Sequence, residues 1–143
     1  MRHTATSLAI ALALLACRTP TPARMPAPTA ALHDIWALET LAGQPYTPAE
    51  GVEHPSLELN LTDMRALGTD GCNRFTGDIR EADAKTLAFG PLAGTRKLCH
   101  EGMATADAFT RALAQTAAYR REGLTLTFLD GDGAPIMVLR KVD

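Results

Sequence analysis

Strict alternation of apolar and polar residues in two stretches constrains the fold of this 143-residue chain more than any other feature. The stretches are residues 57–61, where leucine occupies every second position, and residues 124–128 near the C-terminus. A period of two is typical of a β-strand with one buried face and one solvent-facing side. The chain is therefore predicted to build a sheet that covers a core on one face.

Further apolar segments, bounded by turn-forming residues, predict additional strands. These segments are residues 35–41, 65–69, 75–80, 86–89 and 136–139. The Asp-Gly-Asp-Gly sequence at 130–133 separates the last two predicted strands and is typical of a hairpin turn. We expect these strands to form a mainly antiparallel sheet.

One helix is predicted between residues 103 and 119, because apolar side chains recur there at intervals of three or four residues. Its apolar face consists of Ala106, Phe109, Leu113 and Ala117. Thr105 is suited to cap the N-terminus, with Asp107 in the first turn, where the helix dipole favours negative charge. The order of elements predicts an α+β fold: a mainly antiparallel, strongly curved, barrel-like sheet with one helix inserted before the C-terminal hairpin.

The first 17 residues have the pattern of an export signal. Arg2 precedes an apolar run at 8–16, which is too short to cross a bilayer, and Cys17 follows directly. A cysteine at this place resembles the bacterial lipobox, whose cysteine is lipidated and becomes the mature N-terminus. We predict a lipoprotein signal peptide at residues 1–16 and lipidation of Cys17. The alternative is an ordinary signal peptide with a passive cysteine.

Residues 17–32 are predicted to be the lipidated cysteine and a Pro-rich spacer, because their prolines favour an extended, semi-stiff chain. Several acyl chains on one cysteine would anchor the protein stably in a membrane. Arg18 is not the aspartate associated with inner-membrane retention in enteric bacteria, which favours the outer membrane. We therefore expect residues 33–143 to be one domain in the cell envelope, lipid-anchored and facing the periplasm.

The charge of this domain argues against nucleic acid as a partner. From His33 onward, the chain carries 11 lysines and arginines against 16 aspartates and glutamates, a net charge of −5 with histidine neutral. A nucleic-acid-binding surface needs a basic face that displaces counterions. The composition of the domain offers no such excess of positive charge.

A compact block at residues 71–77, Gly-Cys-Asn-Arg-Phe-Thr-Gly, is the most specific motif of the chain. The sequence Trp-Ala-Leu at 36–38 precedes it, and Thr95 and Cys99 follow it. In order and spacing, this pattern resembles the META domain, the module of the heat-shock protein HslJ and of many bacterial lipoproteins. The resemblance extends over residues 35–142.

The resemblance implies a non-enzymatic protein of the cell envelope, associated with heat or antibiotic stress and without a cofactor. Two departures from the usual pattern are Ile79 and the Arg-Lys-Leu sequence at 96–98. They bear on any ligand contact carried over from relatives rather than on the fold.

Two cysteines, Cys72 and Cys99, remain once Cys17 is lipidated. In an oxidising compartment they are predicted to form a disulfide, which would close a loop of about 27 residues and stabilise the domain by about 3–4 kcal/mol. The alternatives are two buried, reduced thiols, or a catalytic thiol with His100 as its base. Adjacent residues of a strand point to opposite faces, which argues against the catalytic pair.

Three residues are candidates for binding. Asn73 and Arg74 could grip a small anionic ligand or a partner loop. Their structural alternative is a turn, in which glycines supply positive φ angles, Asn73 bonds its own backbone and Arg74 braces a carboxylate or carbonyl. Trp36, the single tryptophan, is either a ligand platform or a core residue, and its apolar neighbours favour the core.

No metal or catalytic site is predicted. His33, His54 and His100 lack the close spacing of zinc ligands. Asp130 and Asp132 fit a hairpin turn better than a calcium loop. The sequence also lacks a phosphate-binding loop, a nucleophile elbow and a local acid–base pair of carboxylates.

These observations predict an envelope-tethered META-domain lipoprotein without enzymatic activity. We expect it to support stress tolerance by contacting another envelope component. The alternative is a small-ligand-binding periplasmic domain, with a partly open sheet that holds an apolar or anionic molecule. A deep pocket near Arg74 or Trp36 would favour the ligand, whereas a filled core with an exposed apolar patch would favour the contact.

Overall fold

The computed structural model describes residues 27–142, so the predicted signal peptide at 1–16 and Cys17 lie outside the described residues. Two helices and nine strands follow one another along this part of the chain. They are α1 (Ala27–Ala30), β1 (Ile35–Leu41), β2 (Gln44–Pro45), β3 (Ser56–Asn60), β4 (Arg65–Thr69), β5 (Arg74–Ala82), β6 (Leu87–Gly94), α2 (Met103–Gln115), β7 (Ala118–Glu122), β8 (Thr125–Leu129) and β9 (Pro135–Lys141).

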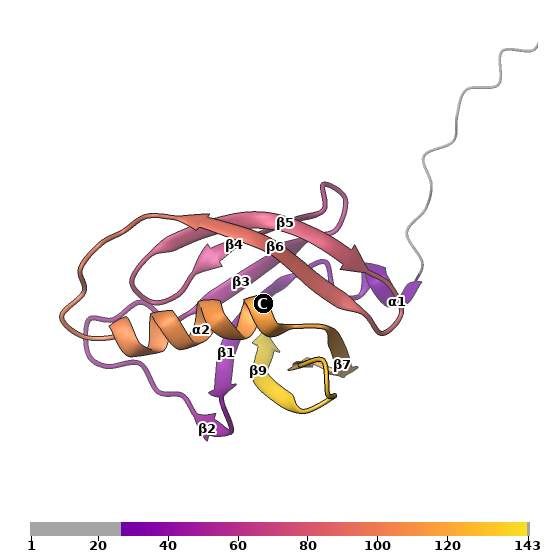
Figure 1. Ribbon diagram of the computed structural model, residues 1–143. Coiled ribbons are helices and arrows are strands. Elements are labelled where there is room, and N and C mark those ends of the chain that lie inside the picture. The colour runs from indigo at the N-terminus through magenta and orange to yellow at the C-terminus, as the bar shows by residue number, and fades with distance from the viewer. Residues whose placement is uncertain (1–26, 143) are drawn as a thin grey trace, which may run out of the picture.

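The strands form one sheet that curls into a half-barrel (Figure 1). Its order is β6-β5-β4-β3-β1-β9-β8-β7, with β2 paired to β1, and the pairings are antiparallel. Helix α2 packs against β6 and β9 along the concave side of the sheet. The predicted α+β fold, with a strongly curved antiparallel sheet and a helix before the C-terminal strands, is confirmed.

A short seam joins the two edge strands of the half-barrel, β6 and β7. An isolated bridge pairs Thr86 with Ala118. Next to it, the Tyr119 backbone N–H donates to the Lys85 carbonyl at 2.9 Å. Residues 120–122 of β7 continue beyond this seam, so the sheet closes at one end of β7 only.

Apolar side chains fill the interior of the half-barrel. The largest fully buried ones are Trp36, Phe109, Phe128, Leu32, Leu38, Leu57, Leu59, Leu87, Leu113, Leu126, Met137 and Leu139. Phe75 of β5 packs on Phe109 of α2 with ring centroids 5.9 Å apart, which joins the helix to the sheet. The alternation predicted for residues 57–61 and 124–128 places Leu57, Leu59, Leu61, Leu126 and Phe128 in this core, whereas Leu124 is 45% exposed.

Helix α2 is shorter than predicted, because the chain leaves the helix at Thr116 instead of continuing to Tyr119. Thr116 has extended dihedral angles (φ −64°, ψ 124°), and the Ala117 N–H donates to the Leu129 carbonyl of β8. Residues 118–122 form strand β7, which was not predicted. The apolar spacing of Ala117 and Tyr119 fits a helix and a strand alike, and pairing with β8 decides between them.

The predicted cap at Thr105 and the acidic first turn at Asp107 are wrong. The helix begins at Met103 after Gly102, and no side chain caps its first turn. Thr105 and Asp107 are the third and fifth residues of the helix. Gly102 has a φ of 90°, and glycine adopts this left-handed conformation without steric cost where the chain enters the helix.

The folded domain begins before His33, within the predicted spacer of residues 17–32. Its first element, α1, is a helical turn rather than extended chain, and Leu32 is fully buried. The Leu32 carbonyl accepts a hydrogen bond from the Trp36 indole N–H at 3.0 Å, which joins the end of the spacer to the core. Within residues 27–142, no helix combines the length and the apolar character that spanning a membrane requires.

Candidate functional site

A tight turn between β4 and β5 forms the base of the candidate site. Asp70, only 5% exposed, accepts hydrogen bonds at Oδ1 from the backbone N–H groups of Cys72 (2.9 Å) and Asn73 (2.6 Å). Gly71 has a φ of 96°, a conformation that favours glycine. The turn expected in this block is therefore present, and the buried Asp70 carboxylate holds it.

A disulfide and two hydrogen bonds join this turn to the loop between β6 and α2. Cys72 and Cys99, 27 residues apart, form the disulfide. Asn73 Oδ1 accepts hydrogen bonds from the Lys97 backbone N–H at 2.7 Å and from the Thr95 hydroxyl at 3.0 Å. Asn73 thus bonds a neighbouring loop, whereas the predicted turn requires a bond to its own backbone. We call residues 95–101 the pinned loop, because these bonds fix its position.

The disulfide excludes both alternatives with free thiols, namely two buried, reduced thiols and a catalytic thiol. A bonded sulfur is neither a nucleophile nor a thiolate ligand for a metal. The catalytic pair of Cys99 and His100 therefore has no thiol in this structure, and His100 is exposed to solvent.

The pinned loop presents an apolar side chain beside two cations. Leu98 is 96% exposed, and Arg96 and Lys97 are exposed as well. Because its base is fixed in advance, the loop loses little conformational freedom when it meets a partner.

A hollow of about 420 Å³ lies beside the pinned loop. Its lining combines the polar residues Asn73, Thr95 and Arg96 with the apolar residues Phe75 and Leu92. Asn73, one of the predicted binding residues, lines this hollow with its amide oxygen already engaged by the loop.

Arg74 braces a carboxylate, as its structural alternative predicted. Its Nη2 atom lies 3.2 Å from Glu53 Oε1, and the two side chains are 74% and 52% exposed. An exposed pair of this kind contributes about 0–1 kcal/mol. The Arg74 backbone N–H also donates to Thr95 Oγ1 at 3.2 Å, which adds a bond to the base of the pinned loop.

Trp36 is a core residue and takes no part in the site around Asn73. Its side chain is fully buried, and its indole N–H is used by the Leu32 carbonyl. The guanidinium of Arg121 lies over the ring at 5.6 Å from the ring centroid. The ligand-platform interpretation of Trp36 is therefore corrected in favour of the core.

A larger groove, of about 880 Å³, lies along β7, and we call it the seam groove. Its apolar lining includes Ala31, Ala118, Leu124 and Leu129. Its charged lining consists of Lys85, Arg120 and Arg121. The groove forms where β7 continues past its seam with β6. No sequence pattern indicated it, because periodicity within single segments does not encode how two edge strands meet.

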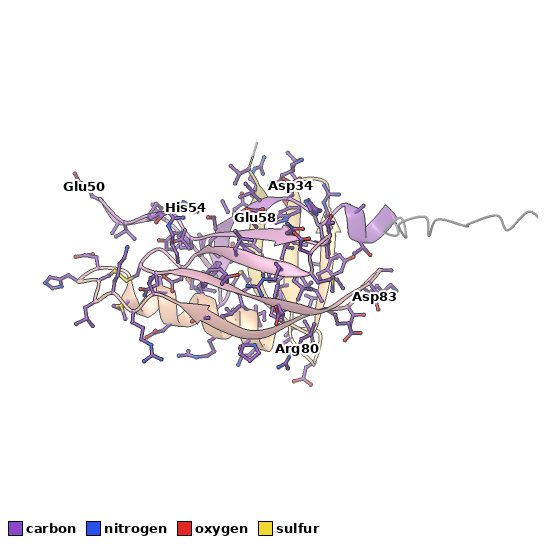
Figure 2. The ribbon with its side chains drawn as sticks, turned by 90° about the horizontal axis from the view of Figure 1, so that it is seen from above. Asp34, Glu50, His54, Glu58, Arg80 and Asp83 are labelled. Atoms are coloured by element: carbon purple, nitrogen blue, oxygen red, sulfur yellow. A yellow bond between two sulfur atoms is a disulfide. The ribbon has the colours of Figure 1, made fainter. Side chains whose placement is uncertain are left out.

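The pinned loop and the seam groove occupy opposite ends of the molecule. In Figure 1 the connection from β6 to α2 lies at the left, whereas α1 and the turn between β5 and β6 lie at the right. Figure 2 shows the yellow disulfide at the end near Glu50, with Asp83 at the other end. Because Ala31 lines the seam groove, the described chain begins beside this groove and far from the pinned loop.

One carboxylate next to the seam groove is held ionised by backbone groups. Asp83 Oδ1 accepts the backbone N–H groups of Lys85 and Thr86, each at 2.9 Å, and these bonds lower the pKa of Asp83 to about 2. Burial raises the pKa of Tyr119, and the negative charge of Asp83 raises it further. The Tyr119 hydroxyl donates to the Asp83 carbonyl at 2.8 Å, which fixes the turn against β7.

No group of three or more metal-ligating side chains comes together within residues 27–142. His33 Nδ1 accepts the Leu61 N–H at 3.1 Å, and His54 Nε2 lies 2.7 Å from the Leu38 carbonyl. Asp130 Oδ1 accepts backbone N–H groups of its own hairpin turn. These polar side chains therefore serve local structure.

The family is decided by a comparison with family models, in which the model of the META domain matches residues 30–143. The chain belongs to the META domain family. No curated protein matches its sequence.

Two solved structures share the fold of this META domain. One, determined by NMR, is 23% identical, covers 82% of this chain and 96% of its own, and has a TM-score of 0.60. Another NMR structure, of a protein from Burkholderia xenovorans, is 22% identical, covers 91% of this chain and 97% of its own, and also has a TM-score of 0.60. At these identities the likeness shows that the folds are similar and nothing about function.

Proposed function

We propose that this META-domain protein is a lipoprotein tethered in the cell envelope through Cys17, without enzymatic activity. It supports tolerance of heat or antibiotic stress by contacting another envelope component through the pinned loop. One observation carries the proposal: Leu98 is almost fully exposed on a loop that the Cys72–Cys99 disulfide and Asn73 hold in place.

The chemistry of the pinned loop favours a partner with an apolar pocket and an acidic rim. Burying a leucine side chain contributes about 1.5–3 kcal/mol, which Leu98 gains only on binding. Arg96 and Lys97 beside it favour negative charge on the partner and would speed association through long-range attraction. The hollow next to the loop offers a place for a side chain of the partner.

The position of the loop agrees with a tethered module. The described chain begins at α1, at the opposite end of the molecule from the pinned loop (Figure 1). An anchor on Cys17 would therefore hold the loop away from the membrane and toward the periplasm. This orientation supports contact with a component beyond the membrane surface.

The use of the reactive side chains supports a role without catalysis. Cys72 and Cys99 are bonded to each other, and His33 and His54 contact backbone groups. The pinned loop adds cations and a leucine, which recognise a surface but do not by themselves transfer a group or a proton.

The proposal is tested by complementation in cells that lack the gene, under heat or antibiotic challenge. Full-length protein with Leu98→Glu is compared with Leu67→Glu, which changes a partly exposed leucine on β4, outside the pinned loop. We expect Leu98→Glu to lose protection and Leu67→Glu to retain it, with equal protein levels. A photo-crosslinker at position 98 should form a discrete adduct with an envelope component. Full protection by Leu98→Glu would refute the proposal.

A second function, binding of a small ligand, is favoured by the seam groove. Its volume lies within the range of about 300–1,000 Å³ that is typical of small-molecule sites. Arg121, which lies over Trp36, borders it. The hollows lined by Arg74 and by Asn73 are smaller, at about 250 and 420 Å³.

A further inference from the structure

The charge of the seam groove is opposite to that of the domain around it. From His33 onward the chain has 11 basic and 16 acidic residues, a net charge of −5. Of the described residues that line the groove, three are cations (Lys85, Arg120 and Arg121) and none is a carboxylate. A concentration of cations in one groove of an acidic domain favours an anionic group at this place.

The carboxylates around these cations already have partners. Asp34 pairs with Lys141 Nζ at 2.8 Å, and Arg121 attracts it without forming a salt bridge. Asp83 is occupied by backbone N–H groups of its own turn. Glu122 pairs with Arg120 Nε at 3.1 Å, so of the three groove cations Arg120 is the one that is already balanced.

Lys85 and Arg121 are the cations that remain for a ligand. Neither forms a salt bridge within the part of the chain that the structure describes. The face of the buried Trp36 ring positions the Arg121 guanidinium. A guanidinium held in this way presents a planar set of donors that matches a carboxylate or a phosphate.

The apolar lining of the groove is elongated. Leu124 precedes β8 and Leu129 is its last residue, so the two leucines lie about 17 Å apart at the usual rise per residue. Residues 118–121 of β7, which pairs with β8, line the groove between them. Ala31 and Ala118 line the same groove with small side chains that leave it open. Leu124 is 45% exposed, and a ligand that covers it would remove apolar surface from water.

We propose that the seam groove binds an amphiphile with one apolar chain and an anionic head group. The chain lies along β7, between Leu129 and Leu124, and the head group, a carboxylate or a phosphate, meets Lys85 and Arg121. The source of this amphiphile is the lipid of the membrane, because the chain before α1 leads from the groove to Cys17. This assignment of the source rests on the proposed anchor, whereas the binding site does not.

The test uses the full-length protein with Cys17→Ser, so that no acyl chain of its own enters the groove. It is titrated with dodecyl phosphate below the micelle concentration, and binding is followed by calorimetry and by Trp36 fluorescence, which Arg121 influences through its position over the ring. We expect saturable one-to-one binding. Dodecyl maltoside, which has the same chain and no charge, and inorganic phosphate alone should not saturate the groove at the same concentrations.

Variants locate the site. Lys85→Gln combined with Arg121→Gln, and separately Leu124→Glu, should each weaken binding of dodecyl phosphate by about tenfold or more, as expected for loss of one charge-assisted contact or of apolar burial. Leu67→Glu is the matched control for Leu124→Glu and should bind as the parent does. Circular dichroism melts establish that each variant is folded.

Three results would overturn the proposal: equal affinity for dodecyl maltoside, saturation by inorganic phosphate alone, or an equal loss in Leu67→Glu and Leu124→Glu. The variant Leu98→Glu distinguishes this proposal from the proposed function, because it changes only the pinned loop. We expect Leu98→Glu, at the far end of the molecule, to bind dodecyl phosphate as the parent does even where it fails to complement. The two proposals therefore fail independently.

Discussion

The two ends of this META domain are held together by different means. At the pinned loop, the Cys72–Cys99 disulfide and the amide of Asn73 fix a segment whose side chains stay in water. At the α1 end, Leu32 and Trp36 are fully buried, and the edges of the sheet meet over a short seam. Order in this fold thus has two separable sources: covalent and polar bonds at one end, and apolar burial at the other.

Removing apolar burial at the α1 end should have the largest effect. Trp36→Ala deletes a fully buried side chain and is expected to lower the free energy of unfolding by about 3–5 kcal/mol. Leu98→Ala at the other end removes a side chain that is 96% exposed, and should change it by less than about 0.5 kcal/mol. Urea unfolding followed by circular dichroism measures both. Similar costs for the two variants would contradict the comparison.

Removing the Cys72–Cys99 disulfide should have the second largest effect on the free energy of unfolding. Cys72→Ala combined with Cys99→Ala opens a loop of 27 residues and is expected to cost about 3–4 kcal/mol. Hydrogen exchange should show faster exchange in residues 95–101 than the global loss of stability explains. If exchange in the pinned loop rises no more than in β1, the disulfide does not order the loop specifically.

Removing the polar bond should have a smaller effect on the same end. Asn73→Ala removes the acceptor of the Lys97 N–H and of the Thr95 hydroxyl, and because both donors are exposed and can bond to water, we expect a cost of about 0.5–1.5 kcal/mol while the disulfide stays intact. Arg74→Ala is the matched control, since its ion pair with Glu53 is exposed. Unfolding of both variants under oxidising conditions measures the difference, and a larger cost for Arg74→Ala would reverse our assignment.

The smallest effect is expected at the turn beside the seam, and it depends on pH. Because the folded-state pKa of Asp83 is lowered from 3.8 to about 2, its ionisation favours the folded state above pH 3.8, and this contribution is lost as the pH falls toward 2. Asp83→Asn should therefore lower the urea midpoint at pH 6, and the difference from the parent should vanish by pH 2. An equal difference at both pH values would exclude this role.

Local pattern predicts much of the sheet. The strand with alternating leucines (β3) and the strand Arg65–Thr69 (β4) are found as predicted. A period of two indicates a strand when one face of the segment is buried. Strand β7 was missed, since its Ala118 and Tyr119 also continue the helical spacing of α2. Only the partner strand β8 distinguishes the two conformations, and that information is tertiary.

Only part of the candidate site could be predicted from the sequence. The expected oxidising compartment and the cysteine count predict the Cys72–Cys99 bond, because that prediction depends on composition more than on geometry. The exposure of Leu98 could not be predicted, because a leucine is expected to be buried until the path of the backbone around it is known. Its only signal was that Arg-Lys-Leu at 96–98 departs from the usual family pattern. The seam groove had no local signal at all.

The hydrogen bond from Trp36 to the Leu32 carbonyl has a mechanical consequence for an anchored protein. A pull on the N-terminal segment reaches the sheet through Leu32 and then β1, which lies between β3 and β9 in the middle of the strand order. To pull β1 out of the sheet, two ladders of hydrogen bonds must therefore break, whereas an edge strand is held by one. The proposed tether at Cys17 would thus pull on a central strand of the sheet and not on an edge strand.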